Sequence, residues 1–460
     1  MTAAKLTAAI RSIVRRLRHG DVPRLGPVGL VSLYYLNHLR ERIRRLESEA
    51  AILRAGGAAA PTSSDRGAEA KPRSVVFLHH DYYHFYYLAQ ALRRRGWDAV
   101  SVSLEGPDSP NARYYHGEDL NLYDPDPAVF ARKAAEFAAE VRRRFRMVHF
   151  YGKGQMSFFP ATYDHDEIYS GVPEDFVDLR RHGIKIGYTV CGCLDGIAQS
   201  SFHRWSGGAC DKCVWQNNPQ ICSDRRNLAW GHKVAMFCDL VATEGDPALD
   251  YQGGPKCYRE PLTTALDPEF WRPDLAIPEN RRLARGPNEL IVFHAVGNFA
   301  SRARQGRNIK GTPAVMAAIE RLRGEGVPVR LEFVSDIPNR EVRFIQAQAD
   351  VIVDQLNFGR YGATAREGLM LGKPTICRID GREPTGTPEL DSIRECPLVS
   401  ADESTIYAVL RDLLLDADKR RRIGAQSRAY ALKWHAADAC AERFERVYDR
   451  LTTEQPIAAG

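Results

Sequence analysis

The chain has 460 residues, of which 44% are hydrophobic and 27% are charged. This length exceeds one ordinary domain, and the composition is that of a globular protein, so two domains with extensions are expected. The 64 Lys and Arg against 58 Asp and Glu leave a net charge of only +6, which argues against a nucleic-acid partner. No run approaches the ~18 consecutive apolar residues of a membrane-spanning helix, and a signal-peptide pattern is missing from the start. We therefore expect a cytoplasmic protein.

Residues 1–55 are predicted to form a basic helical extension. Its apolar and basic residues separate onto opposite helical faces, with Leu6, Ile10, Ile13 and Leu17 against Arg11, Arg15 and Arg18. Such a helix fits an anionic membrane surface, which would place the protein peripherally on the inner face of the cytoplasmic membrane. A helix that docks on its own protein or forms a short coiled coil is an equal alternative. Residues 56–73 have the composition of a flexible linker.

From residue 74 onward, short apolar runs alternate with helical stretches. Expected strands are 74–78, 99–104, 147–151 and 185–190, with helices at 86–95, 127–144 and 174–182. After a Pro-rich stretch the pattern resumes with strands 290–295, 329–334, 351–353 and 374–378 and helices 314–323, 340–347 and 364–370. Alternation of this kind predicts an α/β fold of two Rossmann-like domains with parallel sheets, 74–280 and 281–430. The C-terminal helix, 431–460, is expected to cross back to the first domain.

Polar and glycine residues follow the predicted strand 290–295, where ligands bind in open parallel sheets. Gly297, Arg302, Arg307 and Lys310 stand just before the helix that Pro313 would open. Cations beside backbone N–H groups at a helix start suit a diphosphate. A basic surface loop is the alternative interpretation of this segment.

A second group follows the strand 351–353 and consists of Gln355, Arg360, Tyr361, Gly362 and Glu367. Gly362 would let the backbone approach a ligand closely, and Glu367 can accept hydrogen bonds from the two vicinal hydroxyls of a ribose. Taken alone, a Glu on a helix is usually just solvated.

The run 361–376, YGATAREGLMLGKPTI, resembles the G-x-x-x-x-E-A-M-A-x-G-K-P-V-I signature of GT-B glycosyltransferases, particularly glycosyltransferase family 4. Upstream, NIKGT at 308–312 resembles the K-G segment of that family, and ADVIVDQ at 349–355 resembles its A-D-I-x-V-D-Q strand. These motifs occur in the family's order and at its spacing.

The resemblance implies a GT-B enzyme that moves a hexose from a nucleotide-sugar donor to a hydroxyl acceptor, with retention of configuration. Glu367 would bind the ribose, Lys310 and one of Arg302, Arg304 or Arg307 the diphosphate, and Gln355 and Arg360 the transferred sugar. Gly359 stands where the family commonly has a second Glu, so that sugar contact is not carried over. Lysine, arginine and helix-start amides can stabilise the leaving diphosphate, so no cofactor is expected for the chemistry.

Acceptor groups are expected on loops after the N-terminal strands. Candidates are His79, His80 and Asp81, the segment 149–153, and Asp195. We assign catalytic roles to His149 and Asp195, since a His could polarise or deprotonate an acceptor hydroxyl. A hydrogen-bonded core histidine is an equal alternative for His149. The segment YTVCGCLD at 188–195 looks like the family's H-G-x-D turn, with Cys in place of His.

Five of the ten cysteines fall between residues 191 and 222: Cys191, Cys193, Cys210, Cys213 and Cys222. Close pairs separated by a loop can converge on one structural Zn²⁺, here with the last four favoured. Free thiols or a disulfide, and an iron–sulfur or redox role, are the alternatives. The intervening segments 200–208 and 215–221 are expected to be loops. The other cysteines, Cys238, Cys257, Cys377, Cys396 and Cys440, are interpreted as isolated.

Two other functions share these features. A nucleotide-sugar 2-epimerase would have the same architecture but would ignore acceptors, and a noncatalytic zinc-stapled scaffold would use the cysteines and basic extension to bind partners. The glycosyltransferase interpretation is favoured by Lys310 and Glu367 together. Its acceptor would be a saccharide or lipid-linked saccharide in the synthesis of a surface polysaccharide or glycolipid, which the basic extension could bring to the active site.

Overall fold

The computed structural model describes residues 71–78, 83–109, 116–152, 174–190, 192–205, 208–242, 261–304, 306, 308–379 and 391–453. The predicted basic extension 1–55 and residues 56–70 of the predicted linker lie outside these residues, as do His79, His80 and Asp81. Within the described part, no helix has both the length and the apolar character needed to cross a bilayer.

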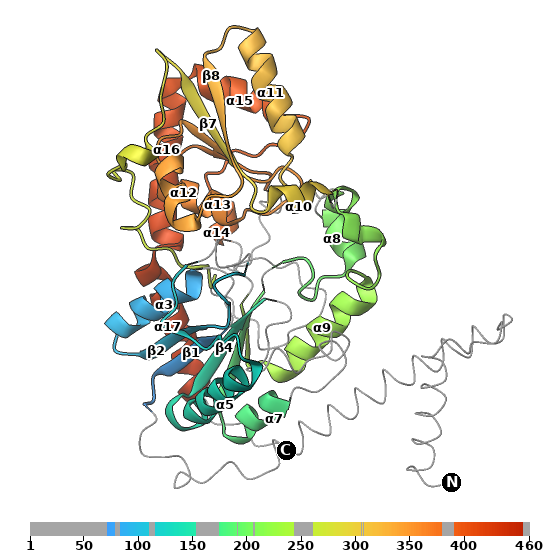
Figure 1. Cartoon of the computed structure of the whole chain (residues 1–460), viewed down its shortest axis with the longest axis vertical. Coiled ribbons are helices and arrows are strands. Elements are labelled where there is room, and N and C mark those ends of the chain that lie inside the picture. Colours follow the sequence, from blue (N-terminus) through green and yellow to red (C-terminus); the bar gives the residue numbers. More distant parts are fainter. Residues whose placement is uncertain are drawn as a thin grey trace, which may run out of the picture. The chain divides into compact units, whose positions relative to one another are not determined.

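The first half of the described chain forms a parallel six-stranded sheet of order β3-β2-β1-β4-β5-β6 (Figure 1). Its strands are β1 (Ser74–Leu78), β2 (Asp98–Ser103), β3 (Leu120–Asn121), β4 (Met147–Tyr151), β5 (Lys185–Thr189) and β6 (Leu240–Ala242). The accompanying helices are α3 (His84–Arg94), α5 (Pro127–Arg144), α7 (Glu174–Arg181), α8 (Gln199–Trp205) and α9 (Asp224–Phe237), with short 3-10 turns η2 (Ala209–Lys212) and η3 (Val214–Asn217).

Every residue of β1 and of β4 is buried, as expected for strands covered by helices on both faces. On one face, Val75 and Phe77 of β1 belong to the same core cluster as residues of α3. On the other face, Phe150 of β4 packs edge-on against Phe176 of α7, with ring centroids 5.1 Å apart. The alternation of apolar runs and helices in the sequence therefore produces a three-layer domain.

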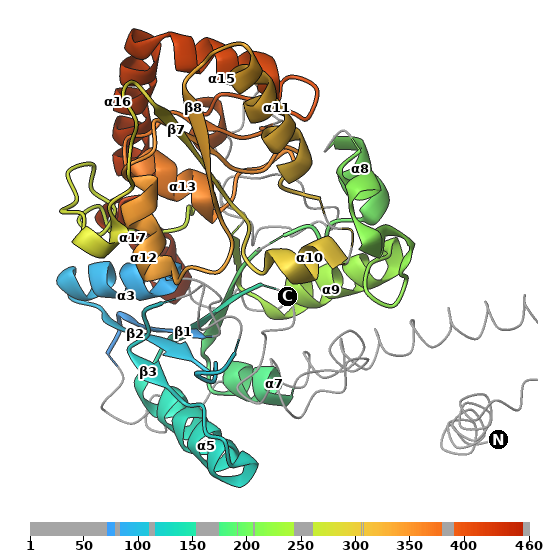
Figure 2. The ribbon, with the colours of Figure 1, turned by 45° about the horizontal axis from the view of Figure 1, so that its top comes forward.

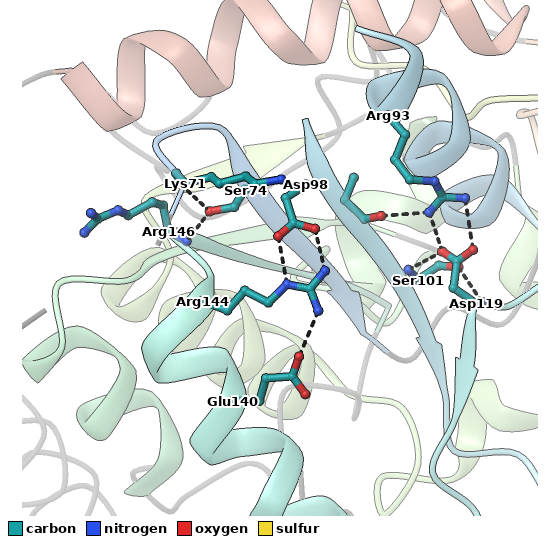
Figure 3. Close-up of polar contacts among 10 residues, drawn as sticks. Lys71, Ser74, Arg93, Asp98, Ser101, Asp119, Glu140, Arg144 and Arg146 are labelled. Atoms are coloured by element: carbon teal, nitrogen blue, oxygen red, sulfur yellow. Dashed lines mark hydrogen bonds and ion pairs between the residues drawn. The ribbon is translucent and has the colours of Figure 1, made fainter. Parts of the chain in front are cut away.

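Polar contacts hold the amino edge of this sheet (Figure 3). Arg144, the last residue of α5, donates to both carboxylate oxygens of Asp98 at the start of β2, at 2.7 and 2.6 Å, and to Glu140 at 2.8 Å. Asp119 accepts from Arg93 and from the backbone and hydroxyl of Ser101. The carboxyl edge, where ligands bind in such sheets, takes no part in these contacts.

The second half forms a parallel four-stranded sheet of order β10-β9-β7-β8. Its strands are β7 (Leu290–Ala295), β8 (Val329–Val334), β9 (Val351–Val353) and β10 (Thr375–Ile376). Its helices are α10 (Phe299–Arg304), α11 (Thr312–Gly324), α12 (Asn339–Gln346), α13 (Ala363–Met370), α14 (Asp391–Arg394), α15 (Ile406–Leu415) and α16 (Ala417–Trp434), preceded by η5 (Glu279–Arg281).

Alternate residues of β7 face different helices. Val292 joins a core cluster with residues of α11 and α15, whereas Ile291 and Phe293 join another with residues of α12 (Figures 1 and 2). This sheet is also covered on both faces. The predicted α/β fold of two Rossmann-like parallel sheets is thus confirmed.

The last described helix, α17 (Ala437–Thr453), packs on the first sheet rather than on the second. Glu445 of α17 accepts hydrogen bonds from Arg95 at 2.6 Å and from the Trp97 indole at 3.2 Å. Three residues further on, Tyr448 lies 2.6 Å from the buried His149 of β4. Because α16 precedes it directly, the chain passes from the second sheet to the first between these two helices.

Close packing of α16 against the turn after α13 gives a stability prediction. A Cβ added at Gly424 of α16 would lie 2.5 Å from the backbone oxygen of Gly372. Gly424→Ala should therefore lower the free energy of unfolding by about 1–3 kcal/mol, the usual cost of overpacking, in denaturant titrations. Gly324→Ala, at the end of α11, is the matched control because its Cβ would meet nothing within 4 Å. Equal effects of the two changes would contradict this packing.

Candidate functional site

The strand order of the second sheet creates a switch point between β7 and β9. From β7 the chain proceeds to β8 on one side, and it later returns through β9 on the other side. The loops that follow β7 and β9 therefore diverge at the carboxyl edge of the sheet, which is where ligands bind in open α/β folds. These are the two loops that carry the residues predicted for the donor site.

A buried carboxylate joins the two loops. Asp354, which follows β9, is fully buried; one of its oxygens accepts from the Lys310 ammonium, and the other accepts from the Gly362 N–H at 2.9 Å. The Lys310 side chain is 14% exposed, and Lys310 stands two residues before the start of α11. Gly311 between them has φ +68°, and a Cβ there would lie 2.8 Å from Leu356. The cation is thus held at a helix N-terminus, an arrangement that favours anions.

Glu367 lies on α13 and is only 3% exposed, unlike a solvated helical Glu. Its Oε1 accepts from the Tyr83 hydroxyl at 2.6 Å and from the Asn339 amide at 3.0 Å, and its Oε2 accepts from Gln346 at 2.8 Å. Burial raises the pKa of the Glu367 carboxyl, while the three hydrogen bonds oppose that rise. Three of roughly four acceptor positions on the carboxylate are used by protein groups.

Tyr83, Asn339 and Gln346 were not predicted as site residues. The contact between Tyr83 and Glu367 spans 284 positions of sequence, from the start of α3 to α13. Nothing local in the sequence around Tyr83 indicates this pairing. Asn339 stands just before the predicted helix 340–347 and Gln346 lies within it, but neither was distinguished from its neighbours by the sequence.

The remaining predicted donor residues surround the same loops. Arg302 lies on α10 and is half-buried, and Gly297 is in the turn that precedes this helix. The side-chain amide of Gln355 donates to the Arg360 carbonyl, and the Tyr361 hydroxyl lies 3.1 Å from the Tyr430 hydroxyl of α16. Arg307 lies outside the described residues. Roles for these residues in donor binding stay predictions.

His149 lies in the middle of β4 and is fully buried. Its Nδ1 is 2.6 Å from the Tyr448 hydroxyl and its Nε2 is 2.8 Å from the Thr189 hydroxyl. Burial lowers its pKa to about 3, so the ring is neutral at physiological pH. With both nitrogens bonded inside the protein, His149 has the geometry of the hydrogen-bonded core histidine that was the alternative interpretation.

Asp195 lies in a turn after β5 and is 2% exposed; its N–H donates to the Gly192 carbonyl at 3.1 Å. The pKa of the neighbouring Cys193 thiol is raised by burial, then by three nearby cysteines, and to a smaller extent by the charge of Asp195. Asp195 therefore belongs to the cysteine-rich region rather than to the second sheet's loops.

None of the four described cysteines of this region, Cys193, Cys210, Cys213 and Cys222, is in a disulfide, and Cys191 lies outside the described residues. Across the described part, no three side chains of the types His, Cys, Asp and Glu already stand where one metal ion would be held. The expectation that residues 200–208 and 215–221 are loops was wrong in part: residues 200–205 belong to α8, and residues 215–217 belong to η3. Short helical turns satisfy backbone groups that a loop would leave to water.

Sequence comparisons found no match among family models or curated proteins. Among solved structures, Anabaena HepE in complex with UDP-glucose has a TM-score of 0.50 at 10% identity, covering 82% of this chain and 99% of that chain. A sucrose-phosphate synthase from Thermosynechococcus elongatus has a TM-score of 0.48 at 14% identity, covering 82% of this chain and 99% of that chain. A UDP-N-acetylglucosamine 2-epimerase has a TM-score of 0.42 at 12% identity, covering 85% of this chain and 100% of that chain. These likenesses concern the fold alone, which is GT-B.

The hydrogen bond from Tyr83 to Glu367 should stabilise the fold. Tyr83→Phe removes the donor from a buried carboxylate and should lower the free energy of unfolding by about 1.5–3 kcal/mol, the worth of a hydrogen bond to a charged group. Tyr407→Phe is the matched control, because the Tyr407 hydroxyl donates to Glu325 over the same 2.6 Å at the exposed surface. Tyr407→Phe is expected to change the free energy of unfolding only slightly. The interpretation fails if denaturant titrations give equal losses for both.

Buried histidines should make stability fall on acidification. Burial lowers the pKa of His149 and His435 to about 3 and that of His294 to about 4, whereas each takes up a proton near pH 6.5 when unfolded. Stability is therefore full above about pH 6.5 and decreases toward pH 4, by up to about 1.4 kcal/mol per pH unit for each histidine.

The slope of unfolding free energy against pH measures this effect. His149→Gln should reduce the slope by about one proton's contribution, whatever its effect on absolute stability. The control is His182→Gln, since His182 is exposed on α7's C-terminal side. If the slope of unfolding free energy against pH is unchanged in His149→Gln, then His149 takes up its proton over the same pH range in the folded and the unfolded protein.

Proposed function

We propose that this protein is a glycosyltransferase of the family 4 type, which transfers a hexose from a nucleotide-sugar donor to a hydroxyl acceptor. The observation that carries the proposal is the position of Lys310, on the loop after β7, and of Glu367, on the helix α13 that follows the loop after β9, on the two sides of the β7–β9 switch point. One supplies a cation at a helix start and the other a buried carboxylate, which are the groups a diphosphate and a ribose need. The similar Anabaena structure contains UDP-glucose, which is a donor of this class.

Lys310 would bind the diphosphate at the N-terminus of α11. Asp354 holds the ammonium in place before the donor arrives, so little side-chain entropy is lost when the phosphate binds. As the glycosyl bond breaks, negative charge develops on the leaving diphosphate, and a fixed cation beside a helix N-terminus stabilises it. Arg302, and Arg307 from the sequence prediction, would add to this charge. We therefore propose chemistry that does not require a metal ion.

Glu367 would bind the ribose by exchanging one hydrogen-bond donor for another. In the ligand-free arrangement the Tyr83 hydroxyl occupies Oε1, where a ribose hydroxyl would also donate. Asn339 and Gln346 would keep the carboxylate oriented while the Tyr83 hydroxyl gives way. Donor binding would thus be coupled to the start of α3, which belongs to the first sheet's domain.

The transferred sugar would lie near Gln355 and Arg360, with Gly297 and Gly362 allowing close backbone approach. We propose a retaining reaction on a saccharide or lipid-linked saccharide acceptor, in surface polysaccharide or glycolipid synthesis. The basic residues 1–55 would attract the enzyme to an anionic membrane surface. Of the two residues predicted for acceptor activation, Asp195 remains our candidate, because both nitrogens of His149 are bonded within the core.

A panel of UDP-, GDP- and ADP-sugars tests the donor site. One nucleotide class should raise the unfolding temperature of the wild type and be hydrolysed slowly. Glu367→Gln and Arg302→Ala should each weaken the affinity for that donor about 10- to 100-fold, as expected for the loss of a hydrogen bond to a charged group. Each variant's shift is measured against its own ligand-free unfolding temperature, so that loss of stability does not count as loss of binding.

Lys433→Ala provides the control, because Lys433 is an exposed lysine of α16 paired with Glu395. It should leave donor affinity unchanged. If no nucleotide sugar stabilises the wild type, or if the two site variants bind the donor as well as Lys433→Ala does, the proposed function is wrong and the noncatalytic scaffold is favoured.

A further inference from the structure

The cysteine-rich region is ordered around a small apolar core. This region, which we call the cysteine module, comprises described residues 192–205 and 208–227 and contains α8, η2, η3 and the first turn of α9. Its core cluster is four buried residues, Ile197, Phe202, Ala209 and Cys210. Segments this small usually need a disulfide or a metal ion to hold a fold. None of its described cysteines is in a disulfide.

The four described cysteines of the module come from three of its segments: the turn after β5, the η2 turn and the turn before α9. Cys210 lies in η2 and Cys213 follows it directly, with the Cys213 N–H donating to the Cys210 carbonyl at 3.0 Å. Cys193 packs against the core cluster that contains Cys210. Cys222 precedes α9 and accepts from the Asn227 amide at 3.6 Å. The pKa of Cys193 is raised to about 12, first by burial and then by the nearness of the thiols of Cys222, Cys213 and Cys210.

We propose that Cys193, Cys210, Cys213 and Cys222 bind one structural Zn²⁺ as a tetrathiolate site. Four S–H groups would lose their four protons to solvent as four Zn–S bonds form, with no change of oxidation state. The sulfurs must move closer together through side-chain and turn movements, because they do not yet stand in ligating positions. Four thiolates from three segments of the module suit tetrahedral Zn²⁺.

The module also contacts both loops of the candidate donor site. Lys212 is the last residue of η2 and lies between Cys210 and Cys213 in the sequence. Its carbonyl accepts from the Asn308 N–H at 3.2 Å. The Lys212 ammonium lies 3.0 Å from Glu403, which also accepts from Asn308 and Asn357 at 2.7 and 2.9 Å. Asn308 is two residues before Lys310, and Asn357 is two residues after Gln355.

A second contact is apolar. Phe202 of α8 packs on Phe358, with ring centroids 5.1 Å apart, and Phe358 lies against the module's core. A metal ion that fixes η2 and α8 would therefore also fix the loops that carry Lys310 and Gln355. This clamping role rests on the proposed function, whereas the metal site itself does not.

Metal content tests the site directly. Full-length protein purified under reducing conditions should contain about one zinc per chain by mass spectrometry of the metals, as for other structural sites of this ligand set. In the Cys213→Ser, Cys222→Ser double variant, zinc should fall at least about fivefold, and uptake of Co²⁺ should lose its visible tetrahedral absorption. Cys238→Ser is the control, since this buried cysteine ends α9 outside the cluster and should leave zinc unchanged.

Three results would overturn the metal site: a wild type that neither contains nor takes up Zn²⁺ or Co²⁺, iron with sulfide in place of zinc, or a disulfide among these cysteines in non-reducing peptide mapping. Zinc that stays at the wild-type level in the folded double variant would do the same. These readouts do not depend on any donor, so they remain decisive if the proposed function fails.

The clamping role has its own test. Lys212→Ala should retain zinc but weaken donor affinity about 3- to 30-fold, the range for coupled residues in contact. Lys433→Ala should change neither. Normal donor affinity in zinc-loaded Lys212→Ala would overturn the clamp and leave the metal site standing.

Discussion

The buried carboxylate of Asp354 is the interaction on which the candidate site depends. A fully buried charge is tolerated only with partners, and Asp354 has two: the Lys310 ammonium and the N–H of Gly362. One partner comes from the loop after β7 and the other from the loop after β9. The carboxylate thus links the loop after β7 to the loop after β9 and holds the Lys310 ammonium between them. Loss of the Lys310 ammonium would leave the buried charge of Asp354 with only the Gly362 N–H as a partner.

The sequence predicted the elements whose signal is local. Runs such as SVVFL at 74–78 and VIV at 351–353 are continuously apolar because both faces of a parallel strand are covered, and this pattern can be recognised without knowing the partners. The loops around Lys310 and Glu367 were likewise marked by glycines and charges at the ends of such strands. Very short strands such as β3 and β6 carry too few residues to show a pattern.

Contacts between distant segments could not be predicted in this way. His149 was considered for catalysis because it follows an apolar run, but its partners Tyr448 and Thr189 come from α17 and β5, and they bury both nitrogens. Tyr83 reaches Glu367 only because the first domain's α3 begins beside α13. In each case a polar side chain finds its partner through the fold, so its role is decided by elements that one-dimensional patterns do not bring together.

Through these long-range contacts, both domains contribute side chains to the candidate site. Helix α17 returns the chain to the first sheet, and residues of α3, α13, α16 and α17 share a single buried cluster. Through this core the first domain contributes Tyr83 to the carboxylate that we assign to the ribose, and the cysteine module contributes Lys212 to the loops beside Lys310. The loops of the second sheet are therefore held from two sides by the first domain. A donor that displaces the Tyr83 hydroxyl would be sensed in α3, on whose sheet the acceptor loops are expected, and this gives a physical route by which donor binding could prepare the acceptor side.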